Sequence, residues 1–304
     1  MDFLIRKARK VIEDPRRALR YVFRTAWRKF LVHTVYRFRN SCHFFINSTA
    51  ITFSTRDWYS REWFFPRCDN GRFHEPAVTR LMLDLAPKAS SFIDVGAHLG
   101  YFTVLMASVM PDKTILALEM DDRAFSFLKE NITLNNNRNI ISVHAAVTRS
   151  GGVVSYRRPK DLDSGESLVP DQSAESGTDV IGTTLDDAWH SAKIIPGIIK
   201  IDVEGAEYDV LRGAPKTLEA RPLLFLEVHG NKLRQFGSTS KEVIAYLEER
   251  SFVVFKIQDH RNSTEPQLLR LSGTDDAFEN NIMTLVVPQA RLGEVGEIVT
   301  MPKH

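Results

Sequence analysis

Apolar and polar residues alternate along the chain in blocks that predict strands separated by helices. Short apolar runs long enough for buried strands lie at 92–95, 114–119, 140–147, 198–203 and 223–228. Segments with helical spacing of apolar residues lie at 75–85, 102–110, 123–134, 184–189, 207–212 and 241–250. Strands that alternate with helices in this way predict an α/β fold with a mostly parallel sheet.

The last two apolar runs, at 252–257 and 282–287, have no helical pattern between them. This ending predicts an antiparallel hairpin on an otherwise parallel sheet, for seven strands in all. Gly151, Gly152 and the run at 153–158 suggest a small hairpin, and residues 160–180 are rich in Ser, Asp, Glu and Gly. We expect a binding loop or a disordered segment at 160–180.

The N-terminal part of the chain predicts a basic amphipathic helix. Asp14-Pro15 is a good helix start, and apolar residues from Leu19 to Phe30 fall on one face while Arg20, Arg24 and Arg28 line another. Residues 1–40 carry 12 Lys or Arg and three acidic residues, so their net charge is +9, whereas the rest of the chain carries −7. Such a helix either lies on an anionic membrane surface or packs on the main domain with a solvated basic face.

Composition places the chain among ordinary globular proteins. It has 304 residues, 43% of them hydrophobic, and only two cysteines, which excludes a disulfide scaffold or a cysteine zinc site. No apolar run reaches the roughly 18 residues of a membrane-spanning helix, and residues 1–10 lack a secretory signal core. We expect an N-terminal extension at 1–73 and a main domain at 74–304. We also expect a cytoplasmic protein, peripheral on the inner face of the membrane if the extension binds lipid.

The stretch from Ser91 to Tyr101 predicts a strand, a tight turn and a helix. Its spacing, Asp94-x-Gly96-x-x-x-Gly100, differs from the Gly-x-Gly-x-x-Gly of dinucleotide-binding proteins. The glycines predict a close approach of the backbone to a ligand. A carboxylate at this turn suits a ligand with an ammonium group and a cationic sulfur better than it suits a pyrophosphate.

Glu119 ends the second predicted strand, 19 residues after Gly100. A carboxylate at this place can accept hydrogen bonds from both hydroxyls of a ribose. The alternative is an exposed acid in a turn.

Acidic residues and a histidine gather at the ends of the fourth and fifth predicted strands. Asp202, Glu204 and Glu207 follow the run at 198–201, and Glu227 and His229 end the run at 223–229 on one side of that strand. These residues suit a general base that removes a proton from a hydroxyl, with Glu227, His229 and Asp202 as candidates. They could also bind a divalent metal through Asp202, Glu204, Glu227 and His229. The plainer interpretation of Glu204 and Glu207 is helix capping, and a basic neighbour or a cation should relieve the repulsion.

These motifs together resemble the FkbM family of S-adenosylmethionine-dependent methyltransferases. The match includes Phe-Ile-Asp94-Val-Gly96, Leu-Glu119, Thr184-Leu-Asp186, Ile-Lys200-Ile-Asp202-Val-Glu204-Gly205 and Glu227-Val-His229. The resemblance covers about residues 75–229 and implies a class I methyltransferase fold (Rossmann-like) that uses S-adenosyl-L-methionine, mostly for O-methylation. It implies that Asp94, Gly96, His98 and Gly100 line the methionine part of the cofactor and that Glu119 holds the ribose. The family's usual Asn is His98 in this chain, and the usual Pro after the ribose acid is Met120.

The expected function is therefore transfer of a methyl group to a hydroxyl of a small molecule, sugar or glycolipid. An RNA methyltransferase is one alternative, although Asp202-Val-Glu-Gly replaces the Asn/Asp-Pro-Pro-Tyr motif of base-amine methylation, and the net acidic main domain suits nucleic acid poorly. A nicotinamide dehydrogenase is disfavoured by the glycine spacing. A membrane-surface module that kept the fold without the chemistry is the remaining alternative.

Overall fold

The computed structural model describes residues 23, 26–27, 30–46, 49–68, 73–156, 178–273, 278 and 280–299. Most of the predicted N-terminal helix and most of the segment 160–180 lie outside these ranges. The chain divides into two units, Met1–Arg72 and Phe73–His304.

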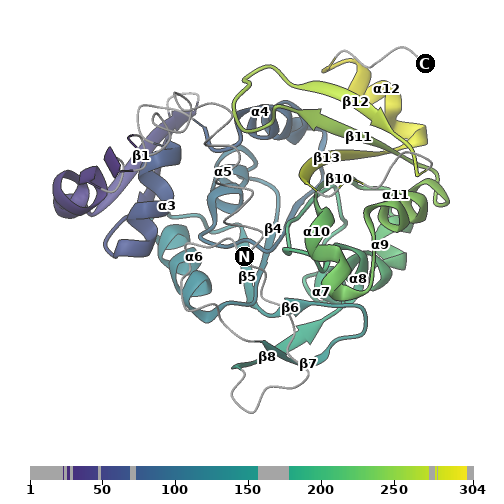
Figure 1. The fold of residues 1–304 in the computed structure, drawn as a ribbon, viewed down its shortest axis with the longest axis horizontal. Helices are drawn as coiled ribbons and strands as arrows, with labels where there is room; N and C mark the ends of the chain where they lie inside the picture. Colours follow the sequence, from purple (N-terminus) through teal and green to yellow (C-terminus); the bar gives the residue numbers. More distant parts are fainter. Residues whose placement is uncertain are drawn as a thin grey trace. The chain divides into compact units, whose positions relative to one another are not determined.

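The larger unit contains an eight-stranded sheet in the order β12-β11-β13-β10-β9-β3-β4-β5 (Figure 1). Five of its strands are parallel: β5 (Ile140–His144), β4 (Ile115–Glu119), β3 (Phe92–Val95), β9 (Ile198–Ile201) and β10 (Leu223–His229). The first four are only four or five residues long, and nearly every residue of β3, β4, β9 and β10 is buried. These strands therefore read as continuous apolar runs, as expected for a sheet that is covered on both faces.

The other end of the sheet is antiparallel. Strand β13 (Asn281–Pro288) pairs with β10, and β11 (Phe252–Gln258) pairs with β13, which confirms the predicted antiparallel ending. The expected number of seven strands was one too few, because β12 (Gln267–Leu271) pairs with β11 at the edge. Only Leu268 of β12 is buried, so this edge strand has no clear apolar pattern in the sequence.

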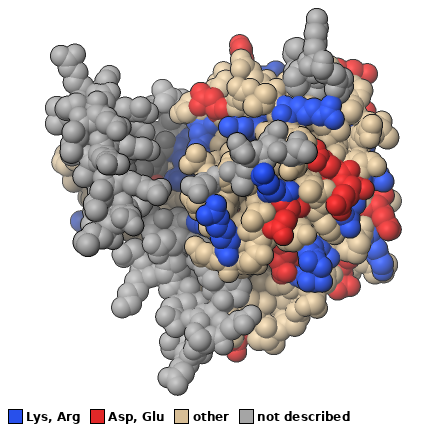
Figure 2. All heavy atoms as spheres, turned by 45° about the vertical axis from the view of Figure 1, so that its right-hand side comes forward, with Lys and Arg blue, Asp and Glu red and all other residues tan. Residues whose placement is uncertain are grey.

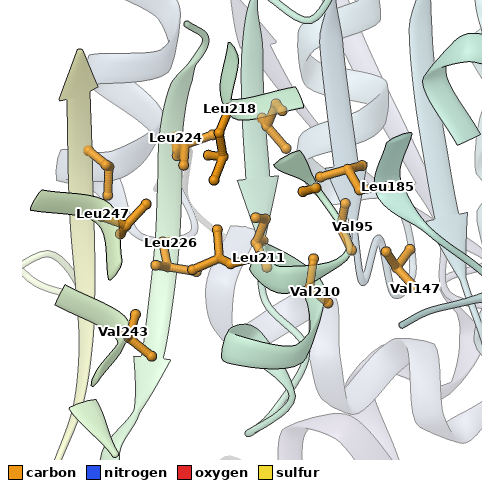
Figure 3. Packing of buried hydrophobic residues seen from close by; sticks show 14 of the residues in the cluster. Val95, Val147, Leu185, Val210, Leu211, Leu218, Leu224, Leu226, Val243 and Leu247 are labelled. Atoms are coloured by element: carbon orange, nitrogen blue, oxygen red, sulfur yellow. The ribbon is translucent and has the colours of Figure 1, made fainter. Parts of the chain in front are cut away.

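Helices cover both faces of the sheet. Leu185 of α7 (Leu185–Ser191), Leu211 of α8 (Glu207–Arg212), Leu218 of α9 (Pro215–Glu219) and Val243 of α11 (Ser240–Glu248) pack with sheet residues in one buried cluster (Figure 3). On the other face, α6 (Asp122–Leu134) packs Leu128 against β4, and α5 (Tyr101–Val109) lies beside β3 and α4 (Pro76–Leu85). Side-chain oxygens of Asp121, Thr184 and Thr239 accept hydrogen bonds at the N-termini of α6, α7 and α11.

A second, three-stranded sheet has the order β6-β8-β7, with bounds Ala146–Val147, Thr178–Thr183 and Gly152–Tyr156. The predicted strand at 140–147 is therefore two strands in different sheets, because Ala145 separates β5 from β6. The remaining short helices of the larger unit are η4 (Ala86–Lys88), α10 (Gly230–Leu233), η6 (Arg234–Phe236), η7 (Gln289–Arg291) and α12 (Leu292–Gly296).

The described part of the smaller unit contains a hairpin and short helices. Strands β1 (Ser41–Ile46) and β2 (Thr49–Ser54) pair antiparallel, and η1 (Leu31–Val35), η2 (Tyr36–Phe38) and α3 (Trp58–Cys68) accompany them. Phe53 of the hairpin stacks on Phe64 of α3, with ring centroids 4.4 Å apart. Among the described residues of the whole chain, no helix is long and apolar enough to cross a membrane.

Candidate active site

The order of the parallel strands reverses between β3 and β9. From β3 the sheet continues to β4 and β5, and from β9 it continues to β10. Ligands of open α/β sheets bind outside the carboxyl ends of the strands at such a switch point. The turn that contains Gly96 and Gly100 follows β3, and the acidic segment 202–207 follows β9, so both sequence motifs meet at this place.

Gly96 allows the turn after β3 to contact the end of β9. Its φ is +78°, and a Cβ atom at this position would lie 2.0 Å from the backbone oxygen of Asp202. The backbone N–H of Gly96 donates to Leu118 O over 2.9 Å, which joins the turn to β4 as well. We expected the glycine to make room for a ligand, but its nearest neighbour is the protein's own backbone.

Glu119 joins the end of β4 to the glycine turn. One carboxylate oxygen accepts the backbone N–H of His98 at 2.7 Å, and the other accepts that of Asp121 at 2.8 Å. Burial raises the pKa of Glu119 to about 7, although both N–H donors favour the charged form. A carboxylate has about four lone-pair positions, so each oxygen can still accept a hydroxyl group. Glu119 is therefore a buried carboxylate with acceptor capacity to spare, and it is not an exposed acid in a turn.

His98 has the left-handed backbone conformation, with φ of +52°. Asn adopts this region more readily than most residues, which explains why the family's usual residue suits the position. His98 also lies close enough to Asp202 to contribute to lowering the pKa of that carboxyl.

Asp94 lies on β3 beneath the edge of the sheet. Its side chain is buried, Oδ2 accepts the hydroxyl of Thr103 at 2.6 Å, and buried Oδ1 has no hydrogen-bond partner in the described part of the chain. Burial raises the pKa of Asp94, while Lys200 and the Thr103 hydroxyl oppose the rise. Both carboxylate oxygens are enclosed by protein, so contact with the cofactor's ammonium group requires a movement of the side chain or a mediating water.

Lys200 of β9 is a buried cation between two acids. It is paired in register with Asp94, and its Nζ lies 3.0 Å from Oδ2 of Asp202. Burial alone would lower the pKa of Lys200, but the carboxylates of Asp202 and Asp94 raise it above the usual value. Burial likewise opposes ionisation of Asp202, but Lys200 and His229 hold its pKa below the usual range.

His229 ends β10 at the centre of the acidic residues. Its Nδ1 lies 2.7 Å from Oε1 of Glu207, and its Nε2 lies 3.1 Å from Oε2 of Glu204. Nε2 is also 3.9 Å from Asp202 Oδ1 and 3.7 Å from Glu227 Oε1. Burial would lower the pKa of His229, but its hydrogen bonds to Glu204 and Glu207 raise it to about 11. Without a metal ion, the ring is therefore an imidazolium at neutral pH.

Glu227 is buried on the same side of β10, as strand alternation predicted. Oε1 accepts a hydrogen bond from the guanidinium of Arg261 at 3.0 Å, and Arg261 also lies 3.7 Å from Glu75. Burial, together with the charges of Asp202 and Glu75, raises the pKa of Glu227 to about 8. Glu227 is thus the candidate base whose pKa lies nearest to neutral pH.

Glu204 does not cap helix α8. The N-cap of that helix is Ala206, without a side-chain hydrogen bond, and Glu204 instead contacts His229 and Lys232. Its φ of +56° is a strained conformation for a residue other than glycine. Glu207 does lie in the first turn of the helix, but it is fully buried and also accepts the N–H of Gly205 at 2.8 Å. Helix capping therefore explains little of this cluster.

The basic side chains around the cluster, and Glu75, were not among the predicted site residues. Lys200, Lys232, Arg261 and Glu75 each contact one of its acidic residues or contribute to its charge. Lys200 could have been predicted from the sequence, because a lysine inside an apolar strand needs a buried acidic partner. The contact of Arg261 could not have been predicted, because Arg261 lies 34 residues from Glu227 in a segment without a motif.

The sheet, its switch point and the acid at the end of β4 define a class I S-adenosylmethionine-dependent methyltransferase. A family model described as the methyltransferase FkbM domain matches residues 94–254, which is more than half of the chain. The chain belongs to the FkbM methyltransferase family.

The chain is also similar, at low sequence identity, to individual methyltransferases. Hexuronic acid methyltransferase AglP of Haloferax volcanii is 23% identical over 192 residues, which are 61% of this chain and 78% of that protein. Methyltransferase 1 of Beauveria bassiana is 25% identical over 148 residues, which are 42% of this chain and 59% of that protein. A solved O-methyltransferase from Bacillus cereus in complex with SAH is 12% identical, with a TM-score of 0.40 over 70% of this chain and 80% of its own.

Proposed function

We propose that the unit Phe73–His304 transfers the methyl group of S-adenosyl-L-methionine to a hydroxyl group of a small molecule, sugar or glycolipid. The observation that carries this proposal is the group formed by Asp202, Glu227 and His229 at the ends of β9 and β10. This group lies at the same sheet edge as Glu119, the proposed ribose ligand. In this proposal the proton acceptor and the cofactor lie together at the switch point between β3 and β9.

The residues of this edge fit the cofactor in two ways. The carboxylate of Glu119 can accept both ribose hydroxyls while it keeps its two backbone donors. Asp94, Gly96, His98 and Gly100 would line the methionine part, with the carboxylate of Asp94 reaching its ammonium group through a movement of the side chain or a water. Gly96 and Gly100 would shape this turn, since a Cβ atom at either position would meet Asp202 or Leu128.

S-adenosylmethionine supplies an electrophilic methyl group. In the proposed reaction a lone pair of the acceptor oxygen forms the new C–O bond in line with the breaking C–S bond, and sulfur keeps the electron pair of that bond. The acceptor's proton passes to a base. Glu227 is the better candidate than His229, because both ring nitrogens of His229 already face carboxylates. The main contribution of the protein is then the positioning of the hydroxyl.

A glycan acceptor is supported by the hexuronic acid methyltransferase among the relatives. An RNA acceptor is less well supported, because basic and acidic side chains are interspersed on the face drawn in Figure 2. A continuous basic surface is what nucleic acid requires.

Transfer of labelled methyl groups tests the proposal. The purified chain is incubated with methyl-labelled S-adenosylmethionine and, separately, with uronic-acid oligosaccharides, neutral oligosaccharides, lipid-linked sugars and bulk RNA. We expect label in a saccharide, stable to mild base as an ether is and unlike a methyl ester. Glu227→Gln should lower kcat at least about 100-fold, while Glu294→Gln, a change of an exposed acid, should not. Label in RNA alone would contradict the proposal, as would binding of cofactor without transfer to any hydroxyl.

For the N-terminal extension we propose attachment to anionic lipid near a glycolipid acceptor, on the inner face of the membrane. Among its described residues, Phe23, Trp27 and Phe30 expose large apolar side chains, and Trp27 stacks on Phe30 with centroids 5.4 Å apart. Aromatic residues beside a basic face suit a lipid headgroup region. Trp27→Ala should reduce co-sedimentation with anionic vesicles, and Phe38→Ala, a change of another exposed aromatic, serves as the control. Equal binding by a chain that lacks residues 1–40 would refute this attachment.

A further inference from the structure

Three potential metal ligands converge at the carboxyl ends of β9 and β10. One carboxylate oxygen each from Asp202 and Glu227 and one ring nitrogen of His229 all lie within 4.8 Å of one another. Glu227 and His229 are buried, and Asp202 is partly exposed, which leaves one side of the group open to a ligand. We propose that these three residues bind a divalent metal ion that holds the acceptor.

The geometry of His229 suits a metal ligand. Its Nδ1 is bonded to Glu207, and its Nε2 faces Glu204 at 3.1 Å, Glu227 at 3.7 Å and Asp202 at 3.9 Å. Metal-bound histidines commonly have their second nitrogen on a carboxylate in this way. Ligand distances of about 2.1 Å place neighbouring ligand atoms about 3.0–3.4 Å apart. The two distances from Nε2 to Asp202 and Glu227 would therefore have to shorten around an ion, and Nε2 would have to give up its contact with Glu204.

Among the acidic residues around His229, two buried oxygens lack hydrogen bonds in the described part of the chain. Oδ1 of Asp202, which faces Nε2 of His229, and Oε2 of the fully buried Glu207 accept none in the described part of the chain. A buried acceptor without a partner is uncommon and calls for an unseen water or ion. Asp202 Oδ1 is the oxygen that a cation beside Nε2 would contact.

The charge of the surroundings also favours a cation. The acidic side chains of the described network outnumber its permanently charged basic ones, Lys200, Lys232 and Arg261. The acidic members are Glu75, Asp94, Asp202, Glu204, Glu207 and Glu227. A dication bound here would add to the positive charges of Lys200, Lys232 and Arg261 that face these acidic side chains.

The donor set selects the kind of ion. Two carboxylates and one imidazole suit Mn²⁺ or another first-row transition metal better than Mg²⁺ or Ca²⁺, which prefer oxygen ligands alone. The ion would keep open positions for water or for an acceptor hydroxyl, whose proton it would make more acidic. Glu227 could bind the ion through one oxygen and take that proton with the other. This role rests on the proposed O-methylation, but the binding of the ion does not.

Titration of Mn²⁺ into the EDTA-dialysed full chain, without cofactor or acceptor, tests the site. Electron paramagnetic resonance of free Mn²⁺ should show one bound ion per chain. Asp202→Asn and His229→Gln should each weaken binding at least tenfold, and Glu207→Gln should weaken it about 10–100-fold. Glu294→Gln, which removes an exposed acid bonded to Arg291, should leave the affinity unchanged.

A second measurement needs no variant and so does not depend on their folding. Electron spin-echo modulation of the Mn²⁺-bound wild type should show a directly coordinated imidazole nitrogen. Absence of binding up to millimolar Mn²⁺, binding without the nitrogen signal, or full affinity in a folded Asp202→Asn variant would each overturn the site. None of these results bears on methyl transfer itself, which the labelling experiment measures separately.

Discussion

Replacing Gly96 with alanine tests how closely the turn after β3 approaches the end of β9. The change introduces two costs. A non-glycine residue at φ of +78° costs about 1–2 kcal/mol in backbone strain. The added Cβ would also meet the backbone oxygen of Asp202 at 2.0 Å, where neither backbone can yield easily, and overpacking of this kind costs about 1–3 kcal/mol. We therefore expect Gly96→Ala to lower the free energy of unfolding by about 2–5 kcal/mol.

Gly237 provides a matched control for the strain alone. Its φ is +71°, and a Cβ there would have no atom within 4 Å. Gly237→Ala should therefore cost only about 1–2 kcal/mol. Gly100→Ala should lie between the two, because its Cβ would meet Leu128 Cδ1 at 2.6 Å, the end of a flexible side chain.

Urea unfolding followed by circular dichroism gives the three values. Both transitions of a chain with two units must be fitted, since a single free energy is defined only for a two-state transition. Equal costs for Gly96→Ala and Gly237→Ala would refute the close contact between the turn and Asp202. In that case the glycine would have to be explained by the ligand instead.

Three further outcomes follow from individual contacts. Glu119 must be ionised to accept two ribose hydroxyls, and its pKa is about 7, so the affinity for S-adenosylmethionine should fall about tenfold from pH 8 to pH 6. Calorimetry at both pH values should show a smaller change for Glu119→Gln, which cannot ionise. Thr239→Ala should cost about 1 kcal/mol in urea unfolding, since it removes the oxygen that accepts Glu242 N–H at the start of α11, and Thr239→Ser should cost little. Leu211→Ala should cost about 2–5 kcal/mol in the same assay, because the side chain is fully buried between α8 and the sheet.

Local pattern was enough to predict the parallel strands. Strands such as Ile198–Ile201 are buried on both faces, so nearly every residue is apolar and the strand can be predicted from the sequence. Strand β12 was missed because most of its residues are exposed, and the break at Ala145 was missed because two strands follow each other without a turn signal. A strand that is mostly exposed or interrupted has no regular pattern of apolar residues from which it can be predicted.

The acidic members of the candidate site were visible in the sequence for a related reason. Strand alternation placed Glu227 and His229 on one side, and the structure confirms their proximity, with Nε2 and Oε1 3.7 Å apart. Which groups pair with them or shift their pKa values depends on contacts between distant segments, as for Arg261 and Glu75, and no local pattern reports such contacts. The hydrogen bonds of His229 to Glu204 and Glu207 were not readable from the sequence, which favoured the base role over the metal role.

Calorimetric titration of S-adenosylmethionine into the wild type, Glu119→Gln and Asp112→Asn tests the central claim most directly. Glu119 ends β4 at the proposed cofactor edge, whereas the exposed Asp112 lies in the turn before the start of that strand. Loss of hydrogen bonds to a charged group costs about 1.5–3 kcal/mol each, and binding should therefore weaken at least tenfold in Glu119→Gln and stay unchanged in Asp112→Asn. Wild-type affinity in a folded Glu119→Gln variant would contradict the assignment of the cofactor to this edge of the sheet.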